Sequence, residues 1–112
     1  MKLTKYTHSC VRLEDHDTVL VLDPGGFSEV EEALEGAQHI LITHVHPDHF
    51  DEEKVLTFLT KNTEVTLHAP AAVVDTVKKA LPDAAATAVT ADGQLELSGF
   101  TIKTFGGQHA VI

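Results

Sequence analysis

The sequence predicts an α+β fold in which one mixed β-sheet is layered with helices, and three observations support this prediction. Short runs of strand-forming residues fill the first 25 positions, apolar runs then alternate with amphipathic segments, and strand patterning returns near the carboxyl end. A chain of 112 residues is long enough to bury one core. We therefore expect a single domain over residues 1–112, with antiparallel strands first and alternating strands and helices after them.

The opening segment predicts two or three short antiparallel strands, interrupted by a polar turn at residues 15–17. The last of these strands is the dense apolar run from Val19 to Leu22. It should end at residues 23–26, Asp-Pro-Gly-Gly, because proline lacks an amide donor and glycine tolerates unusual dihedral angles.

A short helix is predicted over Glu29 to Glu35. Ser28 followed by Glu31 matches a capping box, and Gly36 lies where a helix would stop. The next run, Ile40 to Ile42, is continuously apolar, which is typical of a strand buried on both faces.

Two further strand and helix units follow. Asp51 can cap a helix that ends near Asn62, and residues 64–68 resemble another buried strand. Pro70 then opens a second helix that ends before Pro82. Near the carboxyl end, two alternating runs flank a Ser-Gly pair that can make a tight turn, so a hairpin is expected.

Composition excludes several classes of function. The formal net charge of −9 argues against nucleic acid or an anionic membrane as the main partner, because both would repel such a surface. Cys10 is the single cysteine and cannot form an internal disulfide, and we see neither an export leader nor an apolar run long enough to cross a bilayer. A cytoplasmic protein acting on a small molecule is the expectation.

The stretch "ITHVHPDHF" places three histidines and an aspartate within six positions, directly after an apolar run. Side chains alternate in an extended segment, so His44 and His46 point the same way and can converge on one cation. The proline after them favours a turn that would bring Asp48 and His49 toward the same cavity. This pattern predicts a metal site.

Two divalent ions about 3.5–4 Å apart can share a hydroxide and lower its pKa toward neutrality. Imidazole and carboxylate ligands suit zinc, iron and manganese about equally, so ligand type alone does not choose the metal. We expect zinc first, as one or two ions, with manganese or iron as alternatives.

The motif "THVHPDH" after a strand resembles the H-x-H-x-D-H signature of the metallo-β-lactamase superfamily. The start, "YTHSCVRLEDHDTVLVLDPG", resembles the opening strands of the branch that includes the ascorbate-phosphate lactonase and many metal-dependent hydrolases. The resemblance implies an αββα sandwich, of which this chain would be the N-terminal half. It would then form a mixed sheet with helices packed on one face.

The resemblance also implies ligand roles. His44, His46 and His109 would bind one metal ion, while Asp48 and His49 would bind a second. In that family the aspartate equivalent to Asp48 also orients the hydroxide and takes its proton, so Asp48 is the catalytic candidate.

Three positions are weaker candidates for the surroundings of the site. His8 ends the first strand, where this branch often carries a histidine facing the active-site mouth, although a packed strand-end residue is the alternative. Asp23 would support the metal loop or serve only as a turn former. His68, at the end of a later strand, would line the pocket, whereas His39 taken singly is read as an ordinary surface or core residue.

The chain departs from the family after its middle strands. Members take a bridging carboxylate and a final histidine from a second half, but this sequence has no acidic residue after Glu96 and no histidine after His109. Two hypotheses follow. The chain is a partial or truncated metal-dependent hydrolase, cleaving an ester, lactone or phosphoester with help from a complementing second half. Alternatively, it is a metal-binding half-domain that self-associates into a homodimer with little turnover.

Overall fold

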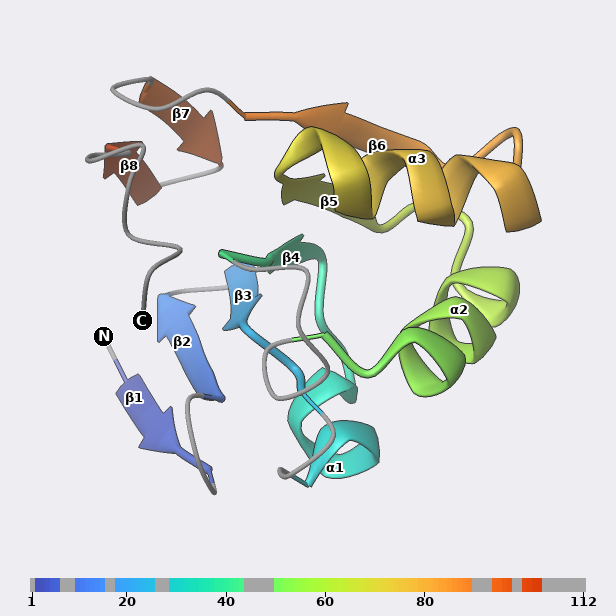
Figure 1. Ribbon diagram of the computed structural model, residues 1–112. Helices are drawn as coiled ribbons and strands as arrows, with labels where there is room; N and C mark the ends of the chain where they lie inside the picture. Colours follow the sequence, from blue (N-terminus) through green and yellow to red (C-terminus); the bar gives the residue numbers. More distant parts are fainter. Residues whose placement is uncertain are drawn as a thin grey trace.

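The computed structural model describes residues 2–6, 10–15, 18–25, 29–43, 50–89, 94–97 and 100–103, the last two ranges as backbone (Figure 1). The strands are β1 (Lys2–Lys5), β2 (Val11–Asp15), β3 (Thr18–Leu22), β4 (His39–Leu41), β5 (Thr66–Ala69), β6 (Ala85–Ala88), β7 (Gln94–Leu97) and β8 (Phe100–Lys103). The helices are α1 (Val30–Leu34), α2 (Glu52–Lys61) and α3 (Ala71–Ala80). Strands β1 to β6 form one sheet in chain order, and β7 pairs with β8 separately.

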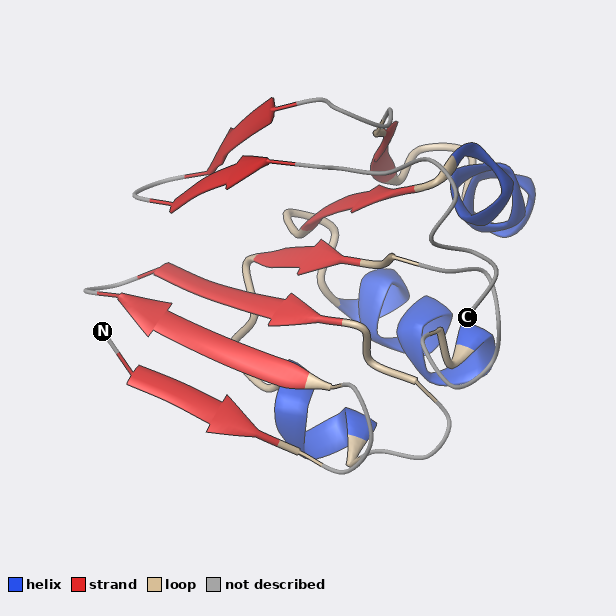
Figure 2. Cartoon of the chain, turned by 60° about the vertical axis from the view of Figure 1, so that its left-hand side comes forward, coloured by secondary structure: helices blue, strands red, loops and turns tan. Residues whose placement is uncertain are grey.

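The sheet is mixed. Strands β1, β2 and β3 pair antiparallel, whereas β3, β4, β5 and β6 pair parallel. Strands β4, β5 and β6 each follow one of the helices. Parallel crossovers are right-handed almost without exception, and here each one moves a strand further in the same direction. All three helices therefore fall on one face of the sheet (Figure 2).

The main core lies between this face and the helices. Val21, Ile40 and Leu67, from three neighbouring strands, are almost completely buried against apolar residues of all three helices. Alternate residues of each strand contribute, as the two-residue period of a strand requires. The core thus fixes the register of the parallel strands and with it the positions of the residues that follow them.

The opposite face of the sheet carries a leucine stripe, made of Leu3, Leu13, Leu20, Leu22 and Leu41. Leu20 and Leu41 are buried, and Leu3 at the outer strand is 63 % exposed. None of the helices described here packs on this face. This face is the side of the sheet on which a further layer would pack.

The predicted fold class, a mixed sheet with helices on one face, is confirmed. Asp51 caps α2 as expected, because its side chain accepts a hydrogen bond from the backbone N of Lys54 at 3.1 Å. The short helix also forms, over Val30–Leu34, and Gly36 with its left-handed φ of 76° directly follows the C-cap Glu35. The N-cap is Glu29, one residue after the predicted Ser28, which lies outside the described residues, and no side-chain bond from Glu29 caps the helix.

Strand β6 was not predicted from the sequence, whereas the terminal hairpin was. In that hairpin Leu97 pairs with Phe100, which leaves two residues for the connection. The expectation of a chain without a membrane span agrees with the described helices, none of which is long and apolar enough to cross a bilayer.

Candidate metal centre

The carboxyl ends of β3, β4 and β5 meet at one edge of the sheet. Leu22, Leu41 and His68 lie side by side in the parallel register, so the segments after them leave the sheet together. The backbone N of Ile42 continues this pairing by donating to the carbonyl oxygen of His68 at 2.9 Å. The loop 44–49, which carries the predicted ligands, starts from this edge.

Asp23 holds the residue that precedes this loop. Its carboxylate accepts two hydrogen bonds from Thr43, one from the backbone N and one from Oγ1, both at 2.7 Å. The side chain is only 4 % exposed, and the backbone is left-handed at φ 50°, a conformation that aspartate adopts more readily than most residues. These short bonds fix the direction in which β4 enters the loop.

The residue after Asp23 holds the other side of the loop. The carbonyl oxygen of Pro24 accepts a hydrogen bond from the backbone N of Asp51 at 2.9 Å, and Asp51 begins α2. Phe50 beside it is buried in the main core. The residues that follow β3 therefore bond to Thr43 before residues 44–49 and to Asp51 after them.

His68 lies at the same edge, and both nitrogens of its imidazole ring are unpaired within the described residues. It is 9 % exposed, and neither ring nitrogen has a hydrogen-bond partner among the described residues. Burial, and then the nearby His39, lower the pKa of this imidazole, which favours the neutral form. Leaving a buried polar group unpaired costs about 1–3 kcal/mol, so the position calls for a partner.

The predicted ligands themselves lie outside the described residues, namely His44, His46, Asp48, His49 and His109, as does the weaker candidate His8. No cluster of three or more potential metal ligands occurs within the part of the chain that the structure describes. Their assignment stays a prediction. Three imidazoles and a carboxylate within six positions are donors that suit zinc.

The roles of Asp23 and His68 also stay predictions, although both lie at the predicted edge. Sequence reasoning missed Thr43, the residue that Asp23 holds. A signal was present, because an aspartate just past one strand and a threonine just past the next should meet when the strands are parallel neighbours.

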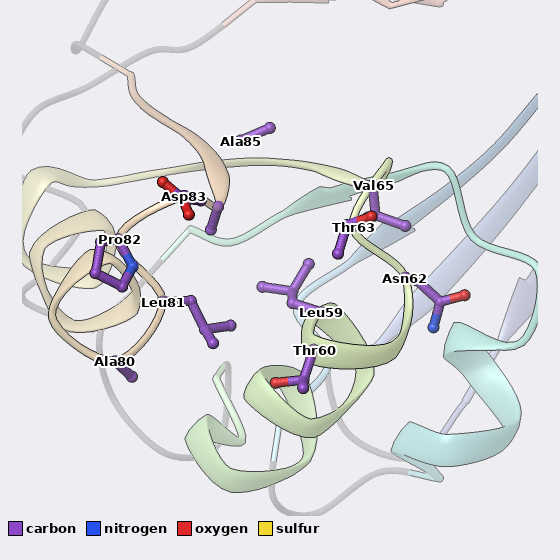
Figure 3. A pocket seen from close by; sticks show the side chains of 11 residues that line it. Leu59, Thr60, Asn62, Thr63, Val65, Ala80, Leu81, Pro82, Asp83 and Ala85 are labelled. Atoms are coloured by element: carbon purple, nitrogen blue, oxygen red, sulfur yellow. The ribbon is translucent and has the colours of Figure 1, made fainter.

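Two hollows lie at the opposite, amino edge of the sheet. One, of about 240 Å³, lies between the carboxyl ends of α2 and α3 and is lined by side chains that include Leu59, Val65 and Leu81 (Figure 3). The other borders His39, whose Nδ1 lies 2.6 Å from Oγ1 of Thr66. Neither hollow is lined by Asp23, Thr43 or His68.

Comparison with known proteins connects these features with a family. Residues 2–112 match the model of the beta-lactamase superfamily domain. Protein Rv0786c of Mycobacterium tuberculosis is 39 % identical over 100 % of this chain and 50 % of its own length. A UPF0173 metal-dependent hydrolase of Xanthobacter autotrophicus is 30 % identical over 98 % of this chain and 49 % of its own length.

The fold has a counterpart among solved structures. The crystal structure of the metallo-beta-lactamase SMB-1, in a complex with mercaptoacetic acid, superposes with a TM-score of 0.62 at 22 % identity, covering 90 % of this chain and 47 % of that one. The chain thus spans about half the length of the curated relatives that it matches.

Proposed function

Because this chain belongs to the beta-lactamase superfamily, we propose that it supplies the metal-binding part of a hydrolase that cleaves an ester, lactone or phosphoester of a small molecule. The observation that supports the proposal most is the way the exit of β3 holds both neighbours of the loop 44–49, through Asp23 and Pro24. The relative named a metal-dependent hydrolase supports the same class of reaction.

The proposed ligands are His44, His46 and His109 for one ion, and Asp48 with His49 for a second. When bound, a divalent cation polarises the bond to be cleaved and makes water a better nucleophile at neutral pH. Asp48 is proposed to orient this water and to accept its proton. Asp23 is proposed to keep the loop in position through Thr43, and zinc is the metal proposed first, with manganese or iron as alternatives.

The relatives have about twice the length of this chain, so the proposal includes a complementing second half. That half would supply further ligands and the loops that select the substrate. A cytoplasmic location is part of the same proposal.

Replacing the two leading histidines tests the metal site. A chain with His44→Ala and His46→Ala should lose tight zinc binding, because two imidazoles of one ion are removed at once. The measurement is zinc per chain after gel filtration, with His39→Ala as the control, since His39 lies at the opposite edge. Unchanged zinc content in the double variant would refute the assignment.

The chemistry is tested separately with Asp48→Ala. Loss of a positioned general base commonly slows a reaction about 10²–10⁴-fold, and a loss of this order in kcat is expected on generic esters and phosphodiesters. Turnover equal to that of the wild-type chain would place any observed activity elsewhere.

A second candidate function follows from the leucine stripe. A sheet face with exposed leucine beside buried leucines needs a covering layer, and a second copy of the chain is one source of it. In this proposal two chains pair face to face as a homodimer that binds metal with little turnover.

The mass of the chain in solution decides between these candidates. Light scattering should give twice the chain mass if the stripes pair, and Leu3→Glu should shift the mass toward the monomer, because it places a charge on the most exposed leucine. A folded monomer at all concentrations contradicts self-association.

A further inference from the structure

The two outermost strands of the six-stranded sheet differ in their protection against pairing with another chain. One outermost strand is β1, Lys-Leu-Thr-Lys, which has a lysine at each end. The other is β6, Ala-Ala-Thr-Ala, which has neither a charged residue nor a proline. Lysine and proline on an outermost strand discourage the addition of a further strand. The sheet is therefore open to extension at β6.

The backbone of β6 offers hydrogen-bonding groups on its open side. The backbone N of Val89 donates to the carbonyl oxygen of Ala69 at 2.9 Å, so it points toward β5. Backbone groups alternate in direction along a strand, so the N–H of Ala88 and the carbonyl group of Ala86 point away from β5. No described strand pairs with this side of β6, since β7 and β8 pair with each other.

The helix α3 borders the same side of the sheet. It packs over β5 and β6, and it is the last of the row of helices α1, α2 and α3 (Figure 1). Its side toward α2 includes Ala80, which lines a hollow together with Leu59 of α2. Ala71 precedes Ala80 by about two and a half turns, at about 3.6 residues per turn, so it lies on the opposite side of the helix. Asp75 and Lys78 follow Ala71 at i+4 and i+7, so the side of α3 beyond β6 carries these three residues.

The charges on this side of α3 have no partners in the chain. Asp75 and Lys78 are exposed, and neither forms an ion pair within the described residues. The helix carries two lysines and one aspartate, although the whole chain has a net charge of −9. Two acidic copies of the chain would thus repel each other least at this surface.

We propose that two copies of this chain associate through β6 and α3 about a twofold axis, so that their sheets become continuous. Two equal strands that pair antiparallel across such an axis present the same surface to each other. Neighbouring strands lie about 4.8 Å apart, so a helix over β5 and β6 lies about 5 Å from the axis. The two copies of α3 would lie about 10 Å apart, which is within the usual distance of packed helices.

The same symmetry makes the two helices complementary. The start of α3 lies beside the end of the partner's α3, so the small Ala71 leaves room for the partner's Lys78. Asp75 lies about one turn further along, where the flexible stem of that lysine reaches its carboxylate. Two ion pairs would then form, one on each side of the axis. The proposal depends neither on the metal site nor on the leucine stripe, which stays open to a further layer.

Reversing one charge tests this interface. The contact between one short strand and one helix of each copy is small, so light scattering should show a dimer that dissociates on dilution. Lys78→Glu should raise the dissociation constant of the dimer at least about tenfold, because it places two carboxylates against each other on each side of the axis. Lys79→Glu is the matched control. It makes the same change of charge about 100° further around the helix, so the dissociation constant should stay within about twofold.

A double variant provides the rescue. Asp75→Lys together with Lys78→Glu exchanges the two charges of each ion pair, so the dimer should return. Asp75→Lys alone should weaken the dimer as Lys78→Glu does, and it takes the place of Lys78→Glu if that chain does not fold. Urea unfolding of each variant shows that it is folded before its mass is compared.

The outcomes separate this surface from the leucine stripe. A dimer that dissociates with Leu3→Glu but not with Lys78→Glu overturns the proposal, because the stripes would then form the contact. Equal weakening by Lys78→Glu and Lys79→Glu also overturns it, since the effect would be one of net charge. The same holds for a double variant that stays dissociated, and for a wild-type chain that is a monomer at every concentration.

Discussion

The two edges of the parallel part of the sheet differ in how their polar groups are used. At the amino edge, His39 and Thr66 satisfy each other at 2.6 Å beside a hollow. At the carboxyl edge, the carboxylate of Asp23 accepts hydrogen bonds from the backbone N and the hydroxyl of Thr43. The two ring nitrogens of His68 have no partner among the described residues. The two hollows border the amino edge, and the unpaired ring nitrogens of His68 lie at the carboxyl edge.

This difference teaches that the hollows and the proposed chemistry need not lie at the same edge of the sheet. The hollows at the amino edge are lined by the ends of helices and by turns, and no three metal ligands meet in them. The carboxyl edge is where parallel strands usually present functional groups, because the loops after them converge there. We therefore base the proposed metal site on residues 44–49, which follow β4, and not on the volume of the hollows.

The largest effect is expected from Asp23→Ala, which would break the difference between the edges. The change removes the carboxylate that accepts from the N–H and the hydroxyl of Thr43 in a partly buried place, so the free energy of unfolding should fall by about 1–3 kcal/mol. Zinc affinity should fall as well, because the start of the loop is no longer held. Urea unfolding and chelator competition measure the two quantities.

Asp23→Asn is the control at the same position. Asparagine tolerates the left-handed backbone and keeps one carbonyl acceptor. The free energy of unfolding should therefore fall less in Asp23→Asn than in Asp23→Ala. Equal losses for the two variants would mean that the bonds to Thr43 do not matter.

A smaller effect is expected from Thr66→Val at the amino edge. The change removes the hydroxyl that bonds to His39 in a partly exposed place, so unfolding should become easier by about 0.5–1.5 kcal/mol. Zinc affinity should stay that of the wild-type chain, because Thr66 lies at the opposite edge of the sheet. A large loss of affinity here would remove the distinction between the edges.

The fold was predicted correctly where the local preferences of the residues agree with their tertiary packing. The apolar run around Ile40 became the buried central strand, and Asp51 capped the helix after the loop. Strand β6, with the sequence Ala-Ala-Thr-Ala, has little intrinsic strand preference and forms because β5 offers it a parallel partner. The N-cap of α1 is Glu29, one residue from the predicted Ser28, which is a difference that helix ends commonly show.

The candidate site divides in the same way. The spacing of the loop histidines is a local signal, so the loop was recognisable from the sequence alone. The bonds from Thr43 to Asp23, and the burial of His68, depend on which strands are neighbours and in which register. A sequence read along one dimension does not contain that register directly.

The smallest effect is a dependence of stability on pH that should separate His68 from His39. Burial lowers the pKa of both imidazoles below the usual value of 6.5, with His39 adding to the effect on His68. As the pH falls below that value, the unfolded chain takes up protons that the folded chain refuses, so the free energy of unfolding decreases. The free energy of unfolding is therefore highest above the histidine pKa of the unfolded chain. It decreases as the pH falls from that value to the lower pKa of the folded chain.

Since His68 is the more buried histidine, His68→Leu should reduce the loss of stability at low pH more than His39→Leu does. The measurement is urea unfolding of the metal-free chain at about pH 7.5 and about pH 5.5, on either side of the ordinary histidine pKa. Histidines elsewhere contribute equally in all three chains, so they cancel in the comparison. If His39→Leu flattens the loss more, His39 carries the acid sensitivity, and the contrast between the two edges does not extend to their protonation.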